Sequence, residues 1–417
     1  MNFHAERVNQ ATGIAPHSLT FTTQLGIEDL FIPGLNFAHS AAFISEINYG
    51  HCLMTMRQYI QKIATGPELS KDLSREEASD GMRRILSGDV DPVQAAIFLI
   101  ALRMKRETMP ENLGVLDALL EVTDQATSAV DDVLDLSDPF DGFTRGMPAA
   151  PFLPPVLAAC GIATVGNGAE SIGPKYGATH RKVLRAAGVN VDLSSAQAAQ
   201  QLADERIGWA YVDQRAACPK LHDLVPLRTK IVKRPCLTTL EVLLGPVRGA
   251  QRTHLLTGYV HKPYPPIYTE LARASGYDSA IIVRGVEGGV IPSLNQPSKL
   301  FYYQGEEADK EVRLDPAEFA IQSTGRAVPL PEDLPGQKAD DEIKGSIDAD
   351  ALAQAAAQAG LGALAGESGP VRESLVYGAA LCLIQLGRCP DAASAVEAVR
   401  GVIDGGHAAR RLQAAAQ

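Results

Sequence analysis

The sequence has few of the residues that mark membrane segments or nucleic-acid-binding surfaces. It contains one tryptophan, and only 6% of its residues are aromatic. Lysine plus arginine number 38 against 49 aspartate plus glutamate, which gives a net charge of −11. A surface of this sign has no general affinity for nucleic acid or anionic membranes. No run of 18 apolar residues occurs, so we expect no membrane-spanning helix.

Cysteine is also sparse, and its spacing is not that of a metal site. The six cysteines are Cys52, Cys160, Cys218, Cys236, Cys382 and Cys389. None belongs to a Cys-x-x-Cys pair, and the nine histidines are scattered, so we predict no zinc cluster. No charged-then-apolar leader opens the sequence. We therefore expect reduced thiols and a cytoplasmic protein.

The length of 417 residues and the 46% apolar content indicate a globular chain of two or three domains. Residues 1–51 form an extension of unknown role, in which Ser18–Leu35 is expected to hold a short strand and a loop. Residues 52–128 show apolar residues at helical spacing and predict a small helical domain. Within it, Asp91-Pro92 predicts a helix start, with an aspartate cap and proline at the first helical position. A later segment, about 215–240, is expected to return to this domain.

Residues 129–417 alternate between strand-like and helical patterns. Short strands are expected at 133–136, 162–165, 209–212 and 281–283, with helices at 152–160 and 181–187 between them. This alternation predicts an α/β domain with a mainly parallel sheet and helices on both faces. In such a sheet, ligands bind at the loops beyond the carboxyl ends of the strands. The acidic, proline-containing stretch 305–350 is expected to be a long surface excursion.

Several stretches resemble anthranilate phosphoribosyltransferases of glycosyltransferase family 3, in the nucleoside phosphorylase superfamily. They are Leu86–Lys105, Ala186–Ser194, Arg206–Trp209, Val225–Arg228, Leu243–Pro246 and Gly366–Arg372. Each stretch alone is weak, but their order and spacing are specific, and the resemblance covers roughly residues 54–410. It implies a helical domain joined to an α/β domain, with phosphoribosyl pyrophosphate at the loops of the α/β domain. It also implies an aromatic amine acceptor at the hinge, and homodimers joined through the helical domains.

The first motif of the family is altered here. Where the family has a Gly-Thr-Gly-Gly-Asp phosphate loop, this sequence has residues 138–146, Asp-Pro-Phe-Asp-Gly-Phe-Thr-Arg-Gly. Proline at 139 has no N–H group to donate to a phosphate. The resemblance therefore implies a weaker phosphate site, to which Asp141, Gly142, Thr144 and Arg145 are the candidate contributors, with Arg145 as a charged substitute.

The second motif, Lys-His-Gly-Asn-Arg in the family, is reduced here to Gly166, Asn167 and Gly168. Both cations and the histidine are missing, although Lys175 follows closely and is a candidate replacement. Asn167 is the strongest single candidate for the site, because asparagine tolerates left-handed backbone angles and its amide can donate to a phosphate or a ribose hydroxyl. A structural turn explains Asn167 almost as well.

The third motif is an Asp-Glu pair that holds Mg²⁺ against the diphosphate in the family. Here Glu287 matches the aspartate, and Gly288 removes the second carboxylate. Mg²⁺ prefers oxygen ligands, so this half-loss leaves Glu287 as a weak metal candidate and an incomplete site. Arg228 matches the arginine that binds the acceptor. Its alternative role is a structural salt bridge.

A basic segment, residues 175–252, contains thirteen lysines and arginines but six acidic residues. Such segregation of charge favours an anion-facing surface. The alternative is a set of solvated helix faces paired with acidic residues. Members of one branch of the superfamily with similarly altered motifs look like nucleic-acid-binding dimers. This chain resembles that branch in the loop Phe140-Asp141-Gly142, in Cys218-Pro219 and in the run Glu287–Val290.

Three functions are consistent with these patterns. The first is a glycosyl or phosphoribosyl transferase with a modified site, binding a phosphorylated ribose. The second is a catalytically silent paralogue that binds nucleic acid through the basic segment. The third is a regulatory or scaffold homodimer.

Overall fold

The computed structural model describes residues 54–336 and 347–416. Clustering of the chain gives two units, residues 1–52 and residues 53–417, and the description below concerns the second. The N-terminal extension, with the strand and loop predicted for Ser18–Leu35, lies outside the described residues.

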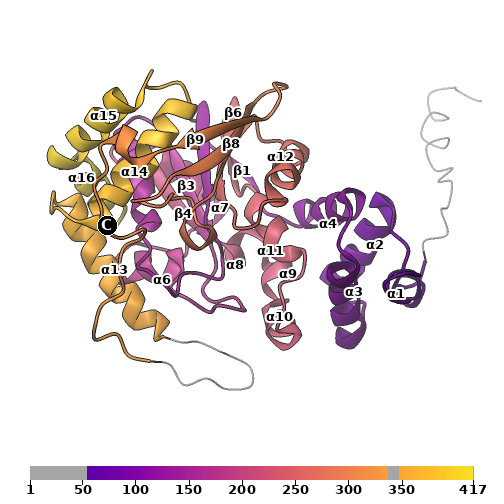
Figure 1. Cartoon of the computed structure of the whole chain (residues 1–417). Coiled ribbons are helices and arrows are strands. Elements are labelled where there is room, and N and C mark those ends of the chain that lie inside the picture. Colours follow the sequence, from indigo (N-terminus) through magenta and orange to yellow (C-terminus); the bar gives the residue numbers. More distant parts are fainter. Residues whose placement is uncertain (1–53, 337–346, 417) are drawn as a thin grey trace, which may run out of the picture. The chain divides into compact units, whose positions relative to one another are not determined.

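The chain first forms a group of four helices (Figure 1). These are α1 (Met56–Ile63), α2 (Arg75–Leu86), α3 (Pro92–Lys105) and α4 (Met109–Glu121). The helix start predicted at Asp91-Pro92 is confirmed, because the Asp91 side chain accepts the N–H of Val93 and Pro92 is the first helical residue. Thr55 and Ser74 cap the first two helices with capping boxes. The helical N-terminal domain is therefore confirmed.

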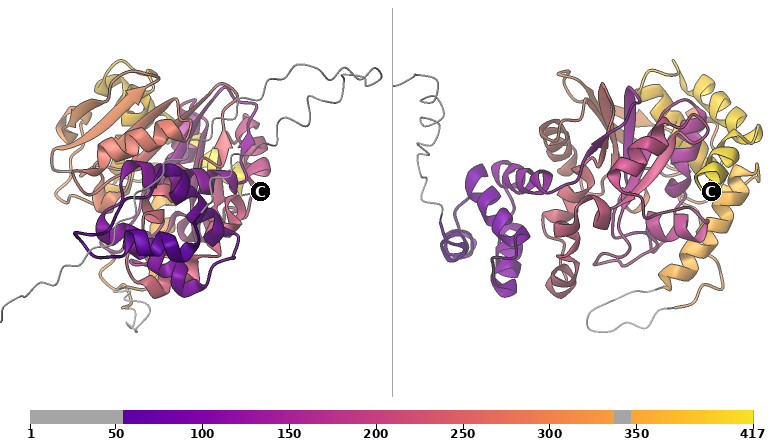
Figure 2. Two further views of the ribbon diagram at one scale, coloured as in Figure 1. Left: turned by 90° about the vertical axis from the view of Figure 1, so that its right-hand side faces the viewer. Right: turned by 180° about the vertical axis from the view of Figure 1, so that it is seen from behind.

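A later part of the chain packs against these helices. It comprises α8 (Gln214–Ala217), α9 (Pro219–His222), α10 (Val225–Ile231) and α11 (Leu237–Leu240). α10 contacts α3, and α11 contacts α4. Leu237 and Leu240 are buried in the same apolar core as Leu99 and Leu116. The right-hand view in Figure 2 shows the indigo helices α1–α4 beside these later helices, at one side of the sheet.

The strands form a seven-stranded sheet within the described residues, in the order β4-β3-β2-β6-β7-β8-β9. They are β2 (Asp132–Ser137), β3 (Thr164–Gly168), β4 (Trp209–Asp213), β6 (Arg252–Gly258), β7 (Ser279–Val283), β8 (Ser298–Gln304) and β9 (Lys310–Leu314). The first five in spatial order are parallel, and β8 and β9 are antiparallel. The expected mainly parallel sheet is confirmed. A separate parallel pair, β1 (Ala126–Thr127) and β5 (Val247–Arg248), lies at the two places where the chain passes from the helical group to the large sheet.

The expectation of a surface excursion over 305–350 is wrong for its first part. Residues 310–314 form β9, which pairs with β8 at the edge of the sheet. The stretch Lys-Glu-Val-Arg-Leu is short and charged but places Val312 and Leu314 on one face, a pattern suited to an edge strand. Because three of the five residues are charged, the sequence alone indicates part of an acidic surface stretch and not a strand.

Helices cover both faces of the sheet. They are α5 (Leu153–Ala159), α6 (His180–Ala186), α7 (Ser195–Ala203), α12 (Tyr264–Ala274), α13 (Ala349–Leu364), α14 (Pro370–Gln385), α15 (Ala392–Asp404) and α16 (His407–Ala415), with short 3-10 turns at Ala150–Phe152, Glu241–Leu243, Val286–Gly288 and Pro316–Phe319. Leu256 and Ile281 pack with α5 and α14 on one face, whereas Leu255 and Ile282 pack with α12 on the other. Alternate residues of each strand are thus buried on opposite faces.

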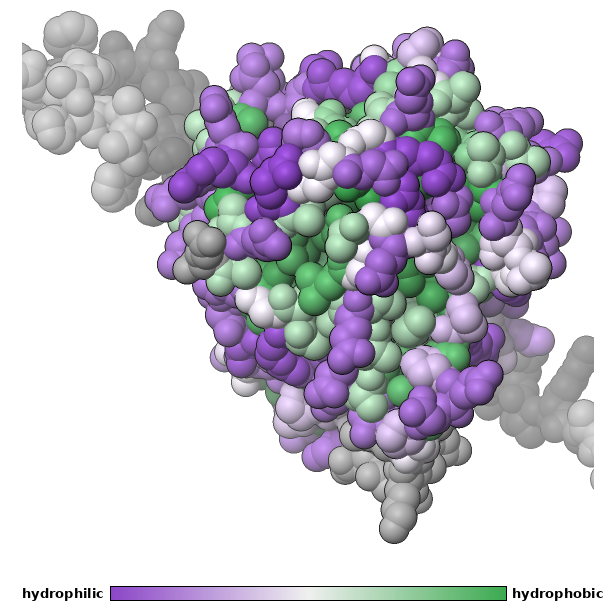
Figure 3. Space-filling view, turned by 90° about the vertical axis from the view of Figure 1, so that its left-hand side faces the viewer, coloured by the Kyte–Doolittle hydropathy of each residue, from purple (hydrophilic) through white to green (hydrophobic). Residues whose placement is uncertain are grey.

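Figure 3 shows the face that carries the C-terminal helices, where an apolar central area is bordered by hydrophilic side chains. Among residues 54–336 and 347–416, no helix combines the length and apolar character needed to cross a membrane.

Candidate functional site

The carboxyl ends of the parallel strands bring four loops to one edge of the sheet. The loop after β2 is 138–146, and the loop after β3 is 169–179. The loops after β6 and β7 are 259–263 and 284–291. Facing them are residues of α3, α4 and the segment before α11. Together these elements line a cleft of about 420 Å³.

The loop after β2 is held by backbone contacts. Phe143 and Ala178 exchange both N–H···O bonds, and Gly142 lies in the left-handed region with φ +74°. A Cβ on Gly142 would meet the backbone of Gly177 at 2.7 Å, so only glycine fits this close approach. Thr144 and Arg145 therefore face the cleft with fixed backbone positions.

Asp141 and Lys175, both predicted site residues, lie together in the cleft. The Asp141 carboxylate is buried and lies 3.1 Å from the Lys175 ammonium. It also accepts two hydrogen bonds from the guanidinium of Arg234, at 3.2 and 2.5 Å. The sequence analysis did not single out Arg234, because the contact joins residues 93 positions apart and no local spacing points to it.

The cleft also contains two arginines that face it without an acidic partner. Arg103 of α3 and Arg145 line it, and neither forms an ion pair within the described part of the chain. Aromatic rings also line the cleft. The ring centroids of Tyr264 and Tyr268 of α12 lie 6.1 Å apart, with His261 next to Tyr264. The lining of the cleft thus combines cationic side chains with flat aromatic rings.

Glu287 lies close to the loop after β2. Its carboxylate accepts the backbone N–H of Thr144 at 3.2 Å and that of Arg145 at 2.8 Å, and Lys175 is 3.9 Å away. Its backbone φ is +54°, a left-handed value that is uncommon for a residue with a side chain. The candidate metal ligand is therefore already engaged with N–H donors.

These carboxylates do not fit a Mg²⁺ ion held by the protein alone. The oxygens of Asp141 pair with two cations, and those of Glu287 accept two N–H groups. No group of three or more histidine, cysteine or acidic side chains with metal-binding geometry occurs in the part of the chain that the structure describes. Mg²⁺ needs several oxygen ligands, which neither carboxylate can provide without breaking an existing contact.

Gly166, Asn167 and Gly168 lie inside β3, not in a loop after it. Asn167 pairs in register with Ser137 and Val212, and its side chain is buried. The Ser137 hydroxyl donates to the Asn167 carbonyl at 2.7 Å, and the Asn167 amide donates to Asp135. The expected left-handed turn is wrong, because β3 extends three residues further and pairs with strands on both sides. A role of Asn167 as a ligand contact stays a prediction.

Asp135 is the centre of this buried network. Its other carboxylate oxygen accepts the hydroxyl of Tyr277 at 2.5 Å. Burial raises the pKa of Asp135 to about 7, although the hydrogen bonds from Tyr277 and Asn167 and the charge of Arg248 oppose the shift. The raised pKa brings the protonation change of this buried carboxyl close to neutral pH.

Arg228 forms a buried pair with Glu241. The guanidinium donates to both carboxylate oxygens, at 2.6 and 2.8 Å, and both side chains are almost fully buried. Gln214 donates to the same carboxylate. Arg228 is not among the residues that line the cleft. The geometry matches its alternative role as a structural salt bridge, and acceptor binding by Arg228 stays a prediction.

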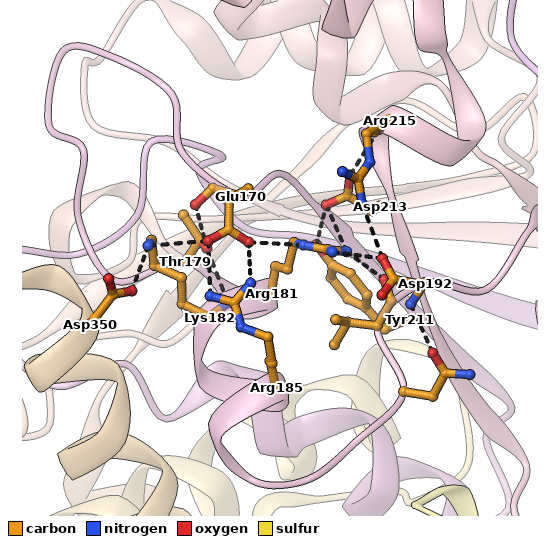
Figure 4. A network of polar contacts seen from close by, with 12 residues as sticks. Glu170, Thr179, Arg181, Lys182, Arg185, Asp192, Tyr211, Asp213, Arg215 and Asp350 are labelled. Carbon is orange, nitrogen blue, oxygen red and sulfur yellow. Dashed lines mark hydrogen bonds and ion pairs between the residues drawn. The ribbon is translucent and has the colours of Figure 1, made fainter.

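Most of the basic segment is neutralised within the chain. Nine of its thirteen cations form ion pairs: Lys175, Arg181, Lys182, Arg185, Arg206, Arg215, Arg228, Arg234 and Arg252. Figure 4 shows four of them around Glu170 and Asp192. Although burial opposes it, hydrogen bonds from Arg185 and Lys182 hold the pKa of Glu170 at about 2. This pairing matches the alternative of helix faces paired with acidic residues.

Comparison with known proteins identifies the family. Residues 57–123 match the Glycosyl transferase family, helical bundle domain, and residues 150–409 match the Glycosyl transferase family, a/b domain. The chain belongs to the glycosyl transferase family. The resemblance to anthranilate phosphoribosyltransferases is thereby confirmed at the level of the family.

Individual relatives agree with this assignment. An anthranilate phosphoribosyltransferase of Rhodopseudomonas palustris (strain BisA53) is 26% identical over 362 residues, which are 86% of this chain and 97% of the relative. An uncharacterized protein of Aquifex aeolicus (strain VF5) is 30% identical over 228 residues, 55% of this chain and 67% of that one. This member of the glycosyl transferase family is therefore related to anthranilate phosphoribosyltransferases.

Solved structures show the same fold. The anthranilate phosphoribosyltransferase of Thermus thermophilus superposes with a TM-score of 0.65 at 21% identity, covering 87% of this chain and 98% of that one. The enzyme from Saccharomyces cerevisiae, in complex with PRPP and Mg, gives 0.66 at 16% identity, covering 86% and 96%.

Proposed function

We propose that this protein is a phosphoribosyl transferase-like protein that binds a phosphorylated ribose in the cleft. The observation that carries the proposal is a pair of arginines lining the same cleft, Arg145 in the loop after β2 and Arg103 on α3, which have no ion-pair partner among the described residues. Guanidinium groups bind phosphate oxygens with two parallel hydrogen bonds. The related yeast enzyme has been solved with PRPP and Mg, which indicates the class of ligand to test.

The chemistry would be transfer of a pentosyl group. The bond from C1 of the ribose to the diphosphate breaks with its electron pair on the diphosphate, and an acceptor forms the new bond to C1. Arg145 and Lys175 would stabilise the charge on the departing diphosphate. The rings of Tyr264 and Tyr268 would lie against a flat acceptor. Asp141 and Glu287 are engaged with other groups, so in this chain the cationic side chains, not a carboxylate pair holding Mg²⁺, would offset the charge of the diphosphate.

Calorimetric titration with phosphoribosyl pyrophosphate, with and without Mg²⁺, tests this proposal. We expect saturable binding that is weakened about tenfold or more by Arg145→Ala, since a hydrogen bond to a charged group contributes roughly 1.5–3 kcal/mol. Arg206→Ala is the matched control, because Arg206 pairs with Asp204 outside the cleft. Absence of binding would refute the proposal, and single-stranded DNA binding that weakens steeply with salt would favour the silent paralogue instead.

We also propose that the protein is a homodimer joined through its helical domain. Val93, Ile97 and Met104 are exposed on α3 at 65%, 38% and 76%, and their spacing places them on one face of the helix. A row of exposed apolar side chains of this kind marks a protein interface. Sedimentation equilibrium should give twice the 44.3 kDa mass of one chain, and Ile97→Asp should shift it to the monomer. A monomeric wild type would contradict the dimer. The cytoplasmic location stays a prediction from the sequence.

A further inference from the structure

Glu287 is held in an unfavourable backbone conformation by the loop around it. The left-handed conformation is unfavourable for a residue with a Cβ, because the Cβ crowds the carbonyl oxygen that follows it. Gly258 allows the loop to lie against the end of β6, because a Cβ there would meet the backbone oxygen of Gly288 at 2.1 Å. Gly285 allows the loop to fold back on itself, because a Cβ there would meet the oxygen of Gly289 at 1.7 Å. The loop therefore presses the Glu287 side chain towards residues 144 and 145, where it is 7% exposed.

The groups that Glu287 contacts form an anion site. Two successive backbone N–H groups, from Thr144 and Arg145, point at one carboxylate. Successive N–H groups in a turn bind anions, phosphate included. The Lys175 ammonium lies 3.9 Å from the same carboxylate. The loop after β2 matches the position of the family's phosphate loop. Its two N–H donors are thus already hydrogen-bonded to a carboxylate of the same chain, that of Glu287.

We propose that Glu287 is an internal anion that sets the affinity of this cleft for phosphoryl groups, and that a phosphoryl group binds the loop by displacing the Glu287 carboxylate. The choice of ligand rests on the proposed function. The N–H groups of Thr144 and Arg145 then donate to phosphoryl oxygens in place of the Glu287 carboxylate, and Lys175 pairs with the ligand. Glu287 is a specificity-determining residue in this role, and it weakens the binding of anions.

Replacing Glu287 should change the affinity for the ligand in the opposite direction to replacing a metal ligand. If Glu287 held Mg²⁺ for the ligand, its loss would weaken binding. If Glu287 competes with the ligand, Glu287→Gln should strengthen binding, because the amide keeps the shape of the side chain and removes the charge. Charge-assisted hydrogen bonds are about twice as strong as neutral ones, so the glutamine amide is the easier group to displace.

The experiment is calorimetric titration of the full chain with pyrophosphate, without Mg²⁺, followed by phosphoribosyl pyrophosphate. We expect Glu287→Gln and Glu287→Ala to bind pyrophosphate about tenfold tighter than the wild type, or more. Glu311→Gln is the matched control, since Glu311 is an exposed glutamate that pairs with Lys299 on β8, and it should leave the affinity unchanged. Circular dichroism establishes that each variant is folded.

The outcomes separate this inference from the proposed function. If the wild type binds phosphoribosyl pyrophosphate and neither variant binds pyrophosphate more tightly, the role of Glu287 is refuted and the proposed function stands. If the variants bind pyrophosphate and the wild type binds neither pyrophosphate nor phosphoribosyl pyrophosphate, the role of Glu287 is supported and the proposed function fails. If no form binds either ligand, both proposals fail.

Discussion

Arg228→Ala is expected to lower the free energy of unfolding by about 3–5 kcal/mol, because it leaves the buried Glu241 carboxylate without a cation. Glu241 is only 2% exposed, and Gln214 would be its one remaining side-chain partner among the described residues. Urea unfolding followed by circular dichroism measures the change. Such a loss would mark Arg228 as a structural residue that joins α10 to the turn at Glu241–Leu243.

Two further variants make this result specific. Arg215→Ala removes an arginine that is paired with Asp192 on the surface, and it should cost at most about 1 kcal/mol. Arg228→Met combined with Glu241→Gln removes both charges together and should recover most of the lost stability. If Arg228→Ala leaves stability unchanged and abolishes acceptor binding, Arg228 is a ligand contact instead.

The stability of the protein is expected to depend on pH through Asp135. The pKa of this carboxyl is about 7 in the folded state, against an ordinary value of 3.8. Between these values the folded state retains a proton that the unfolded state releases, so stability falls as the pH rises from about 4 to 7. A shift of this size corresponds to about 4 kcal/mol, as an order of magnitude.

Comparison with Asp135→Asn isolates this contribution, because asparagine stays neutral. The stability of the variant relative to the wild type should rise by up to about 4 kcal/mol as the pH rises from 4 to 8, measured by urea unfolding. Asp204→Asn is the control: hydrogen bonds from Arg206 lower the pKa of Asp204 to about 2, so its stability difference should be constant over this range. A constant difference for Asp135→Asn would contradict the prediction.

The sequence predicted those parts of the molecule that local patterns determine. The start of α3 follows from Asp91 and Pro92 alone, and the alternation of strands and helices indicated the mainly parallel sheet. The altered phosphate loop and the residues after β3 pointed to Asp141, Lys175 and Arg145, which lie in one cleft.

Other features depend on contacts between distant positions, which no local pattern contains. Asn167 lies inside β3, where its side chain donates to Asp135 and accepts from Ser137 across the sheet. Arg234 reaches Asp141 from the far side of the cleft. The carboxylate of Glu287 reaches loop donors more than a hundred positions earlier in the chain, so its role could not be inferred from a motif comparison.

The return of the chain to the helical group affects how the protein folds during synthesis. Leu99 and Leu116 share their apolar core with Leu237 and Leu240, which the ribosome adds more than a hundred residues later. Translation proceeds at about 5–20 residues per second. The side chains that complete the core of the first four helices are therefore synthesised roughly 10 s after those helices. During this interval their apolar faces are open to chaperones, so a pause in translation before residue 237 should raise aggregation of the nascent chain.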